Sequence, residues 1–294
     1  QQIYSQKVEE LLSAGKAYHC YCTPEELDRK RNEAQKAGNK SKYDGTCRKR
    51  SDSPEGVPSV IRFKAPIEGT VVVEDLLRGK VIFDIAELDD VIILRTDGTP
   101  TYNFVVVVDD SEMAITHVIR GDDHINNTPR QINLLKALNA NIPAYAHLSM
   151  ILGDDGQKLS KRHGAVSVMQ YFDQGYLPEA ILNYLARLGW SHGDDEIFSM
   201  TDFCQWFDLD HITSSSAQFN TEKLDWLNSH YIKTLPLDRI SSAIEPYLKK
   251  VVHTPIDQNL LIGAIDIHRE RANHLTSLAG DIAYIFEYQK PNQQ

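Results

Sequence analysis

A continuous apolar run at residues 102–108, with the sequence YNFVVVV, restricts the possible folds more than any other segment. A run without polar alternation is typical of a strand that is buried on both faces, as in the parallel sheet of an α/β protein. Asp109 and Asp110 follow the run, and residues 116–120 form a second candidate strand. Ligands of open α/β sheets lie beyond the carboxyl ends of the strands. The sequence therefore predicts an α/β fold with a binding site at the ends of these two strands.

The rest of the chain divides into a mixed part and a helical part. Short β-rich segments, separated by Pro and Gly turns, occupy residues 60–63, 69–73, 81–83 and 91–94. Helical patterns occupy residues 5–15, 24–36, 130–138, 167–172, 178–188, 240–248 and 260–286. A chain of 294 residues with 41% hydrophobic content can bury at least one full core, and its length indicates roughly two domains or more.

A glycine- and aspartate-rich turn leads into a basic cluster at residues 151–164, ILGDDGQKLSKRHG. Lys158, Lys161 and Arg162 supply three cations, and Ser160 supplies a hydroxyl group. Such a cluster on a flexible loop suits a polyphosphate whose charge grows during a reaction. A solvated basic loop without a function is the alternative from composition alone.

Three cysteines gather on either side of the charged helical segment 24–36, at Cys20, Cys22 and Cys47. Thiolates prefer zinc, and a loop-rich segment gains stability from a tetrahedral zinc site. The fourth ligand is open, and His19 is one candidate. The alternative is a degenerate site with ordinary reduced cysteines.

The overall net charge of −10 is unfavourable for binding a nucleic acid, but the basic residues are unevenly distributed along the chain. They concentrate at residues 29–42, 48–50 and 158–162, so local patches could bind RNA despite the acidic total. No run of 18 apolar residues occurs, and the chain begins without a basic and apolar signal region. We therefore expect a soluble, cytoplasmic protein that has no membrane partner.

Four ordered stretches resemble the class I aminoacyl-tRNA synthetases, and the bacterial glutamyl-tRNA synthetases in particular. They are YNFVVVVDD at 102–110, VIRGDDHINNTPRQINL at 118–134, HLSMILGDDGQKLSKRHGAVSVMQ at 147–170 and GYLPEAILNYLARLGWSHG at 175–193. KLSKR is similar to the second signature of this class, and the resemblance covers about residues 1–235. The first signature, HIGH, is absent. The chain therefore resembles a fragment without the N-terminal half-domain and most of the anticodon-binding part, and we expect it to be inactive by itself.

The resemblance implies an incomplete Rossmann-like catalytic domain with an α+β insertion, followed by helical regions. Its expected parts are the end of the first Rossmann half (1–16), an inserted acceptor-binding domain with the zinc site (17–92), the second Rossmann half (93–150), the signature loop with a helical stem-contact domain (151–235) and the start of a helical anticodon-binding domain (236–294).

The activity that the resemblance implies is ATP-dependent activation of L-glutamate to glutamyl-adenylate and its transfer to the 3′ end of tRNA(Glu). Arg120 and Tyr102 match the glutamate-binding residues, and Lys161 and Lys158 match the catalytic lysines. The expected ATP-binding residues are Asp123, Ile151, Lys158, Ser160, Lys161 and Arg162. Magnesium is expected to arrive with the nucleotide. The expected partners are tRNA(Glu), L-glutamate and ATP, and the expected state is a monomer.

The resemblance also bears on the metal site and on rival functions. Many relatives have a histidine where this chain has Lys49, a poor ligand while protonated, whereas glutamyl-queuosine tRNA(Asp) synthetases use a tyrosine at the position of Tyr43. Those enzymes are an alternative, but they end soon after the signature loop, whereas this chain continues for 132 residues beyond KLSKR. A non-catalytic tRNA-binding fragment is a second alternative. Glutaminyl-tRNA synthetase is disfavoured because its later part is β-rich. His124 and His147 are predicted to be hydrogen-bonded structural residues rather than general bases.

Overall fold

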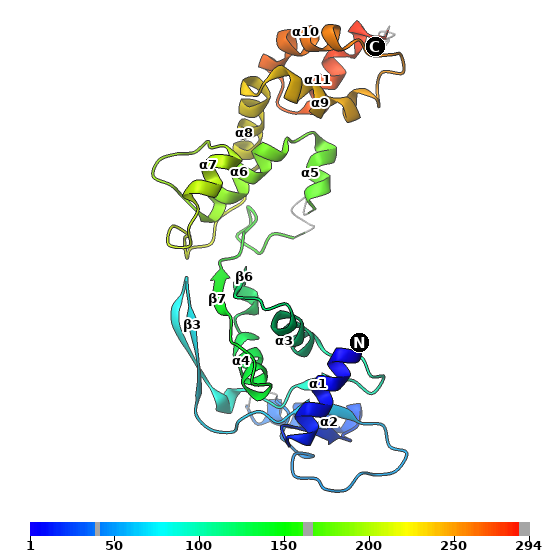
Figure 1. Cartoon of the computed structure of the whole chain (residues 1–294), viewed down its shortest axis with the longest axis vertical. Coiled ribbons are helices and arrows are strands. Elements are labelled where there is room, and N and C mark those ends of the chain that lie inside the picture. The colour runs from blue at the N-terminus through cyan, green and yellow to red at the C-terminus, as the bar shows by residue number, and fades with distance from the viewer. Residues whose placement is uncertain (39–41, 161–166, 288–294) are drawn as a thin grey trace. The chain divides into compact units, whose positions relative to one another are not determined.

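The computed structural model describes residues 1–38, 42–160 and 167–287 and divides into two compact units (Figure 1). Unit 1, Gln1–Leu148, is mixed α/β, and unit 2, Ser149–Gln294, is mainly helical. Across the part of the chain that is described, no helix is both long and apolar enough to span a bilayer.

Three antiparallel strands form the first sheet of unit 1, in the order β1 (Ala17–Cys20), β2 (Val60–Phe63) and β5 (Ile92–Leu94). Helix α1 (Gln2–Ser13) buries Val8 and Leu11 in the same core as this sheet. Helix α2 (Pro24–Lys36) begins at a capping box, in which the Thr23 and Glu26 side chains satisfy each other's backbone N–H groups. The predicted helices at 5–15 and 24–36 are confirmed.

The second sheet of unit 1 has the order β4 (Gly79–Asp84), β3 (Thr70–Asp75), β7 (Ala144–Leu148) and β6 (His117–Gly121). Strands β3 and β4 pair antiparallel, whereas β7 pairs parallel with both β3 and β6. Burial alternates along β3, as expected for a strand with one face on the core. The predicted strands at 69–73, 81–83 and 116–120 are confirmed, while β1 and β7 were not predicted.

Helix α4 (Thr128–Ala137) contributes to both cores of unit 1. Its Leu134 and Leu135 pack with the first sheet, and Ile132 packs with Val71 and Val73 of β3. Pro129 stands in the first turn, where a missing N–H group costs no helical hydrogen bond. The helix therefore ties the two sheets together.

The prediction of a strand at residues 102–108 is wrong, because this segment begins helix α3 (Tyr102–Glu112). Phe104, Val107 and Val108 are buried together at helical spacing. Val105 and Val106 are also partly covered, so apolar residues occupy most of the helix circumference and hide its period. A short apolar run of this kind is compatible with either a strand or a helix.

The predicted position of Asp109 and Asp110 at a strand end is consequently wrong as well. Both residues lie inside α3, and the Asp109 carboxylate accepts a hydrogen bond of 2.7 Å from the Tyr4 hydroxyl of α1. Of the two strand ends expected to face a site, only that of β6 exists.

Unit 2 contains the helices α5 (Val168–Gln174), α6 (Pro178–Gly189), α7 (Met200–Trp206), α8 (Thr221–Thr234), α9 (Leu237–Leu248), α10 (Gln258–His268) and α11 (Leu275–Ile282). One continuous core, from Tyr176 to Ala283, joins most of them. The helices predicted at 167–172, 178–188 and 240–248 are confirmed, and the helical region 260–286 is interrupted between α10 and α11.

Candidate functional site

Arg120 near the end of β6 is the best-supported candidate for a ligand-binding side chain in unit 1. Its Nε atom donates to His147 Nε2 at 3.2 Å, and one terminal nitrogen donates to Thr128 Oγ1 at 2.9 Å and to Gln131 Oε1 at 2.8 Å. The guanidinium also lies 5.5 Å from the centroid of the Tyr145 ring. These hydrogen-bond partners are uncharged, and Arg120 takes part in none of the ion pairs found among the described residues, although Asp110 lies close enough to interact with it electrostatically. The cation is therefore oriented by uncharged protein groups, and no carboxylate of the described residues contacts it directly.

A buried Asp75–His147 pair holds the Arg120 side chain in place through the hydrogen bond between Arg120 and His147. His147 Nδ1 lies 2.6 Å from an Asp75 carboxylate oxygen, and neither side chain is exposed to solvent. Arg120 Nε can only donate, so His147 Nε2 must accept and the imidazole proton must lie on Nδ1, facing Asp75. The geometry thus assigns one neutral tautomer to His147, and the prediction that it is a hydrogen-bonded structural residue is confirmed.

The pKa shifts of the pair agree with this assignment. Burial lowers the pKa of His147 below its ordinary value, and it outweighs the opposing effect of Asp75, while Arg120 and Arg78 lower the pKa further. Burial acts to raise the pKa of Asp75, but the hydrogen bonds from His147 and from the backbone N–H groups of Arg78 and Leu77 outweigh it and keep that pKa low. The folded state therefore holds a carboxylate beside a neutral imidazole.

We expect the free energy of unfolding to fall as the pH drops below the ordinary histidine pKa of 6.5. The unfolded chain then binds a proton at His147 that the folded chain does not bind, so stability decreases with decreasing pH; below about pH 3.8 Asp75 acts in the same direction. Urea unfolding between about pH 7.5 and about pH 5.5 measures this slope. His147→Gln should reduce the slope, and His117→Gln, at an exposed histidine of β6, should not. Equal slopes in all three proteins would contradict the assignment.

Tyr102 lies at the first turn of α3 and is 52% exposed. Its hydroxyl is 3.4 Å from His124 Nδ1, and His124 Nε2 is 4.0 Å from an Asp123 oxygen in the turn after β6. Gln131, which holds Arg120, also donates to Asn103 next to Tyr102 at 3.1 Å. The predicted residues Arg120, Tyr102 and Asp123 therefore belong to one connected network of contacts, although Tyr102 reaches it from a helix.

Of the candidate nucleotide residues that are described, Asp123 belongs to unit 1, whereas Ile151, Lys158 and Ser160 belong to unit 2. Ile151 accepts a backbone hydrogen bond of 2.9 Å from Leu159, and an antiparallel bridge joins Leu152 to Lys158. Gly156 has a φ of 72°, which permits the tight turn between these segments. Lys158 is exposed and Ser160 is partly exposed beyond the turn. Lys161 and Arg162 lie outside the described residues.

A pocket of about 230 Å³ lies beside this turn within unit 2. Ile151 and Leu159 line it together with the aromatic side chains of Tyr171, Tyr184 and Phe219. An apolar, aromatic wall near Lys158 suits a flat ring that carries phosphates.

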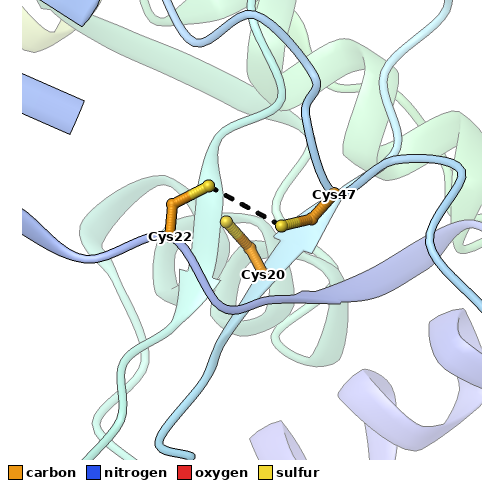
Figure 2. Close-up of side chains that lie close together, drawn as sticks. All are labelled: Cys20, Cys22 and Cys47. Carbon is orange, nitrogen blue, oxygen red and sulfur yellow. Dashed lines mark hydrogen bonds between the residues drawn. The ribbon is translucent and has the colours of Figure 1, made fainter. Parts of the chain in front are cut away.

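The three predicted cysteine ligands converge, and their sulfur atoms lie within 4.8 Å of one another. Figure 2 shows the side chains of Cys20, Cys22 and Cys47 pointing into one common space, with 3.6 Å between the sulfurs of Cys22 and Cys47. Cys20 ends β1, Cys22 follows it in the loop, and Cys47 comes from a turn beyond α2. A set of three thiols at this spacing is typical of a tetrahedral zinc site.

Tyr43 is the fourth polar group at this cluster. Its hydroxyl is 3.3 Å from Cys20 Sγ and 3.9 Å from Cys22 Sγ, and it accepts a hydrogen bond of 2.9 Å from the Cys47 backbone N–H. His19, in contrast, contacts Ser59 at 3.0 Å and is not part of the described metal-ligand group. The donor set of this chain therefore fits a zinc ion with Tyr43 on the fourth side.

The thiols differ in their tendency to ionise. Burial acts to raise the pKa of Cys20, but the Tyr43 hydroxyl, the Cys22 backbone and the Arg62 guanidinium together keep it below its ordinary value. Burial and the neighbouring sulfur of Cys47 raise the pKa of Cys22 to about 12. A bound cation would relieve this conflict, because metal-bound thiols are deprotonated.

Sequence reasoning missed the residues that support the predicted ones. Asp75 ends the alternating strand β3, and no sequence motif marks it as a functional residue. Thr128 and Gln131 are buried polar residues three positions apart on one face of α4. Polar residues at helical spacing, close in the sequence to a candidate strand end, are the signal that could have identified the hydrogen-bond partners of Arg120.

A model of the catalytic domain of the class I tRNA synthetases (E and Q) matches residues 1–226. The chain is 60% identical over 294 residues to a glutamate--tRNA ligase of Methylobacillus flagellatus and covers 62% of its length. It is 58% identical over 281 residues to a glutamate--tRNA ligase of Aromatoleum aromaticum and covers 60% of that protein. These alignments include 98% and 94% of this chain. The chain thus spans about three fifths of the length of these curated relatives.

A crystal structure of a glutamate tRNA ligase from Elizabethkingia meningosepticum, in complex with its amino acid, is similar in fold. The TM-score is 0.83 at 32% identity, and the match covers 98% of this chain and 64% of the other.

Proposed function

Because the chain belongs to the family of class I tRNA synthetases for glutamate and glutamine, we propose that it carries the glutamate-selecting part of a glutamate--tRNA ligase. Such an enzyme activates L-glutamate with ATP to glutamyl-adenylate and transfers the glutamyl group to the 3′ end of tRNA(Glu). In the first step the substrate carboxylate attacks the α-phosphate and pyrophosphate leaves, so the protein supplies positioning and charge rather than a nucleophile.

The observation that carries this proposal is the guanidinium of Arg120, which uncharged groups orient and which no carboxylate of the described residues contacts directly. A planar guanidinium pairs with a carboxylate through two parallel hydrogen bonds, and a neutral amide in the same position would face it with a donor. Because the three hydrogen-bond partners of Arg120 are neutral, the side-chain carboxylate of glutamate would supply the missing charge. Tyr102 would contact the same substrate, since its exposed hydroxyl belongs to the same network.

For the nucleotide we propose Asp123, Ile151, Lys158, Ser160, Lys161 and Arg162 as binding residues. Lys161 and Lys158 would stabilise the charge on the phosphates as it grows in the transition state. The aromatic pocket beside Ile151 supports this assignment for the base of ATP. Magnesium would arrive with the nucleotide and needs no dedicated protein ligand.

We also propose one structural zinc ion held by Cys20, Cys22 and Cys47, with Tyr43 on the fourth side. When bound, zinc would crosslink the end of β1 to the turn after α2, a loop-rich segment with little core of its own. The convergence of three sulfurs within 4.8 Å supports this proposal.

Protein purified without chelator is expected to contain about one zinc per chain, measured by elemental analysis. Tyr43→Phe removes the hydroxyl group at the cluster and should weaken zinc binding at least about tenfold in a chelator competition. Lys49→Ala is the matched control, because Lys49 is exposed and outside the described metal-ligand group. A metal-free protein with full thermal stability would refute the zinc site.

The domain organisation and the cellular setting are further parts of the proposal. Residues 1–16 and 93–150 would be Rossmann halves, 17–92 the acceptor-binding insertion, 151–235 the signature loop and stem-contact domain, and 236–294 the start of the anticodon-binding domain. The partners would be tRNA(Glu), L-glutamate and ATP, with a monomeric enzyme in the cytoplasm. The four free cysteines, none in a disulfide within the described part, support a reducing compartment.

Charging of RNA with labelled glutamate tests the function directly. A protein that contains this chain should glutamylate tRNA(Glu), and tRNA(Asp) should remain uncharged. The Tyr43 position next to the cysteines favours glutamyl-queuosine tRNA(Asp) synthetase as the second candidate. Labelling of tRNA(Asp) alone would establish that candidate, and RNA binding without any labelling would leave only the binding module.

A further inference from the structure

Arg62 of β2 is a buried cation directly beside the cysteine cluster. Only 5% of its surface is exposed. Its guanidinium lies 3.7 Å from the centroid of the Tyr43 ring, and one terminal nitrogen donates to the Asp90 carbonyl at 2.7 Å. The hydroxyl group of the same Tyr43 lies 3.3 Å from Cys20 Sγ. Arg62 therefore connects the first sheet to Tyr43, the fourth polar group at the cluster.

The charge of Arg62 has no carboxylate partner among residues 1–38, 42–160 and 167–287. Asp90 accepts a hydrogen bond from Arg62 only through its backbone oxygen, because its carboxylate pairs with Arg48 and accepts a hydrogen bond of 2.6 Å from the Tyr18 hydroxyl. Arg62 Nε is buried and has no hydrogen-bond partner in the described part of the chain. A buried charge without a counter-charge is costly, so a negative group is expected within its reach.

The cysteine cluster can supply that negative charge when it holds a metal. A zinc ion with three thiolates and a neutral phenol carries one net negative charge, which equals the charge of Arg62 in magnitude. The aromatic ring of Tyr43 lies against the guanidinium, and its hydroxyl lies against the sulfurs. Cation–π attraction of this kind holds a ring in place.

We propose that Arg62 is the buried counter-cation of a zinc–tris(thiolate) centre and the positioning residue that holds Tyr43 against it. This inference rests on the proposed zinc site and adds a function for a residue that binds no metal itself. Groups behind the direct ligands contribute to metal affinity because they orient the ligands and offset their charge.

Two other cations near the cluster provide a comparison. Arg50 lies 5.3 Å from the Tyr21 ring and is fixed by two hydrogen bonds of 2.7 Å to Asp52, and Lys30 pairs with Asp44 at 2.8 Å. Both carry carboxylate partners, and Arg50 is exposed. Since solvent and a partner already screen the charge of Arg50, its removal should matter little to the metal.

The test is zinc affinity, measured by chelator competition on the present chain and on Arg62→Met, Arg62→Lys and Arg50→Met. Arg62→Met keeps the apolar stem but removes the charge, and should weaken zinc binding about 10- to 100-fold. Arg62→Lys retains the charge without the planar stacking group, so its affinity should be intermediate. Arg50→Met removes an exposed cation that also interacts with Cys47, and it should weaken zinc binding much less than Arg62→Met does. Cobalt(II) absorption reports whether each variant still offers thiolate ligands, independently of any activity.

The outcomes separate the inference from the zinc proposal. A chain that binds no zinc or cobalt refutes the zinc site itself. A chain that binds zinc with the same affinity in Arg62→Met refutes the function of Arg62 and leaves the site intact. Equal losses in Arg62→Met and Arg50→Met would also overturn the inference, because any nearby cation would then suffice. If Arg62→Met does not fold, the zinc affinity of Arg62→Lys decides between the outcomes. Full zinc affinity in Arg62→Lys would contradict the stacking of Arg62 on Tyr43, whereas intermediate zinc affinity would support it.

Discussion

Replacing Arg120 by alanine in a protein that contains this chain is expected to lower kcat/KM for glutamate by about 2–5 kcal/mol, or roughly 30- to 4000-fold. The variant loses both hydrogen bonds of the fork and leaves the substrate carboxylate without a counter-charge. The direct partners of Arg120 are neutral, so none of them supplies a positive charge in its place. ATP–pyrophosphate exchange, with tRNA(Glu) present and glutamate varied, measures the loss.

The Arg120→Lys variant separates charge from geometry. Lysine keeps the positive charge but offers no planar fork, so we expect a partial loss that appears mainly as a higher KM for glutamate. The KM for ATP should change little in both variants, because the proposed nucleotide residues are others. Undiminished glutamate use in Arg120→Ala would refute its assignment as the selecting residue.

Replacing Asp75 by alanine should have the largest effect on stability, a loss of about 3–5 kcal/mol in the free energy of unfolding. The carboxylate is fully buried and accepts hydrogen bonds from His147 Nδ1 at 2.6 Å and from the backbone N–H groups of Leu77 and Arg78 at 3.0 Å each. Its removal leaves these donors unsatisfied in the core. The substitution also removes the hydrogen bond that fixes the tautomer of His147, the residue that orients Arg120.

Urea unfolding followed by far-UV circular dichroism and by tryptophan fluorescence measures this loss. The chain has three tryptophans, Trp190, Trp206 and Trp226, and all lie in unit 2, so the circular dichroism should carry the larger shift. Asp97→Ala is the matched control, since Asp97 also accepts a backbone hydrogen bond but lies in an exposed turn. A shift in Asp75→Ala no larger than in the control would contradict the structural importance of the buried pair.

Local sequence signals predicted much of the fold. The helical patterns at 24–36 and 178–188 and the β-rich segments between Pro and Gly turns each extend over about a dozen residues or fewer. The cysteine cluster was also predictable from the sequence. Cys20 and Cys22 are two residues apart at the end of a strand, and a single helix lies between them and Cys47. These features depend on short-range chemistry, which a single sequence contains.

The errors and omissions have long-range causes. The run at residues 102–108 was mistaken for a strand because its helix is covered on most sides, and only tertiary burial reveals the period. Asp75 and His147 are 72 residues apart, and the parallel pairing of β3 with β7 brings them together. No local pattern indicates such a pair, nor does one indicate that Arg62 would lie against Tyr43.

The amino-acid dependence of ATP–pyrophosphate exchange tests the central claim most directly, in a protein that contains this chain and with tRNA(Glu) present. Glutamate should support exchange, and glutamine should support it at least about 100-fold less well, because an amide leaves a donor facing the Arg120 guanidinium. Equal exchange with glutamine, or exchange with neither amino acid, would contradict the assignment of this chain to glutamate activation.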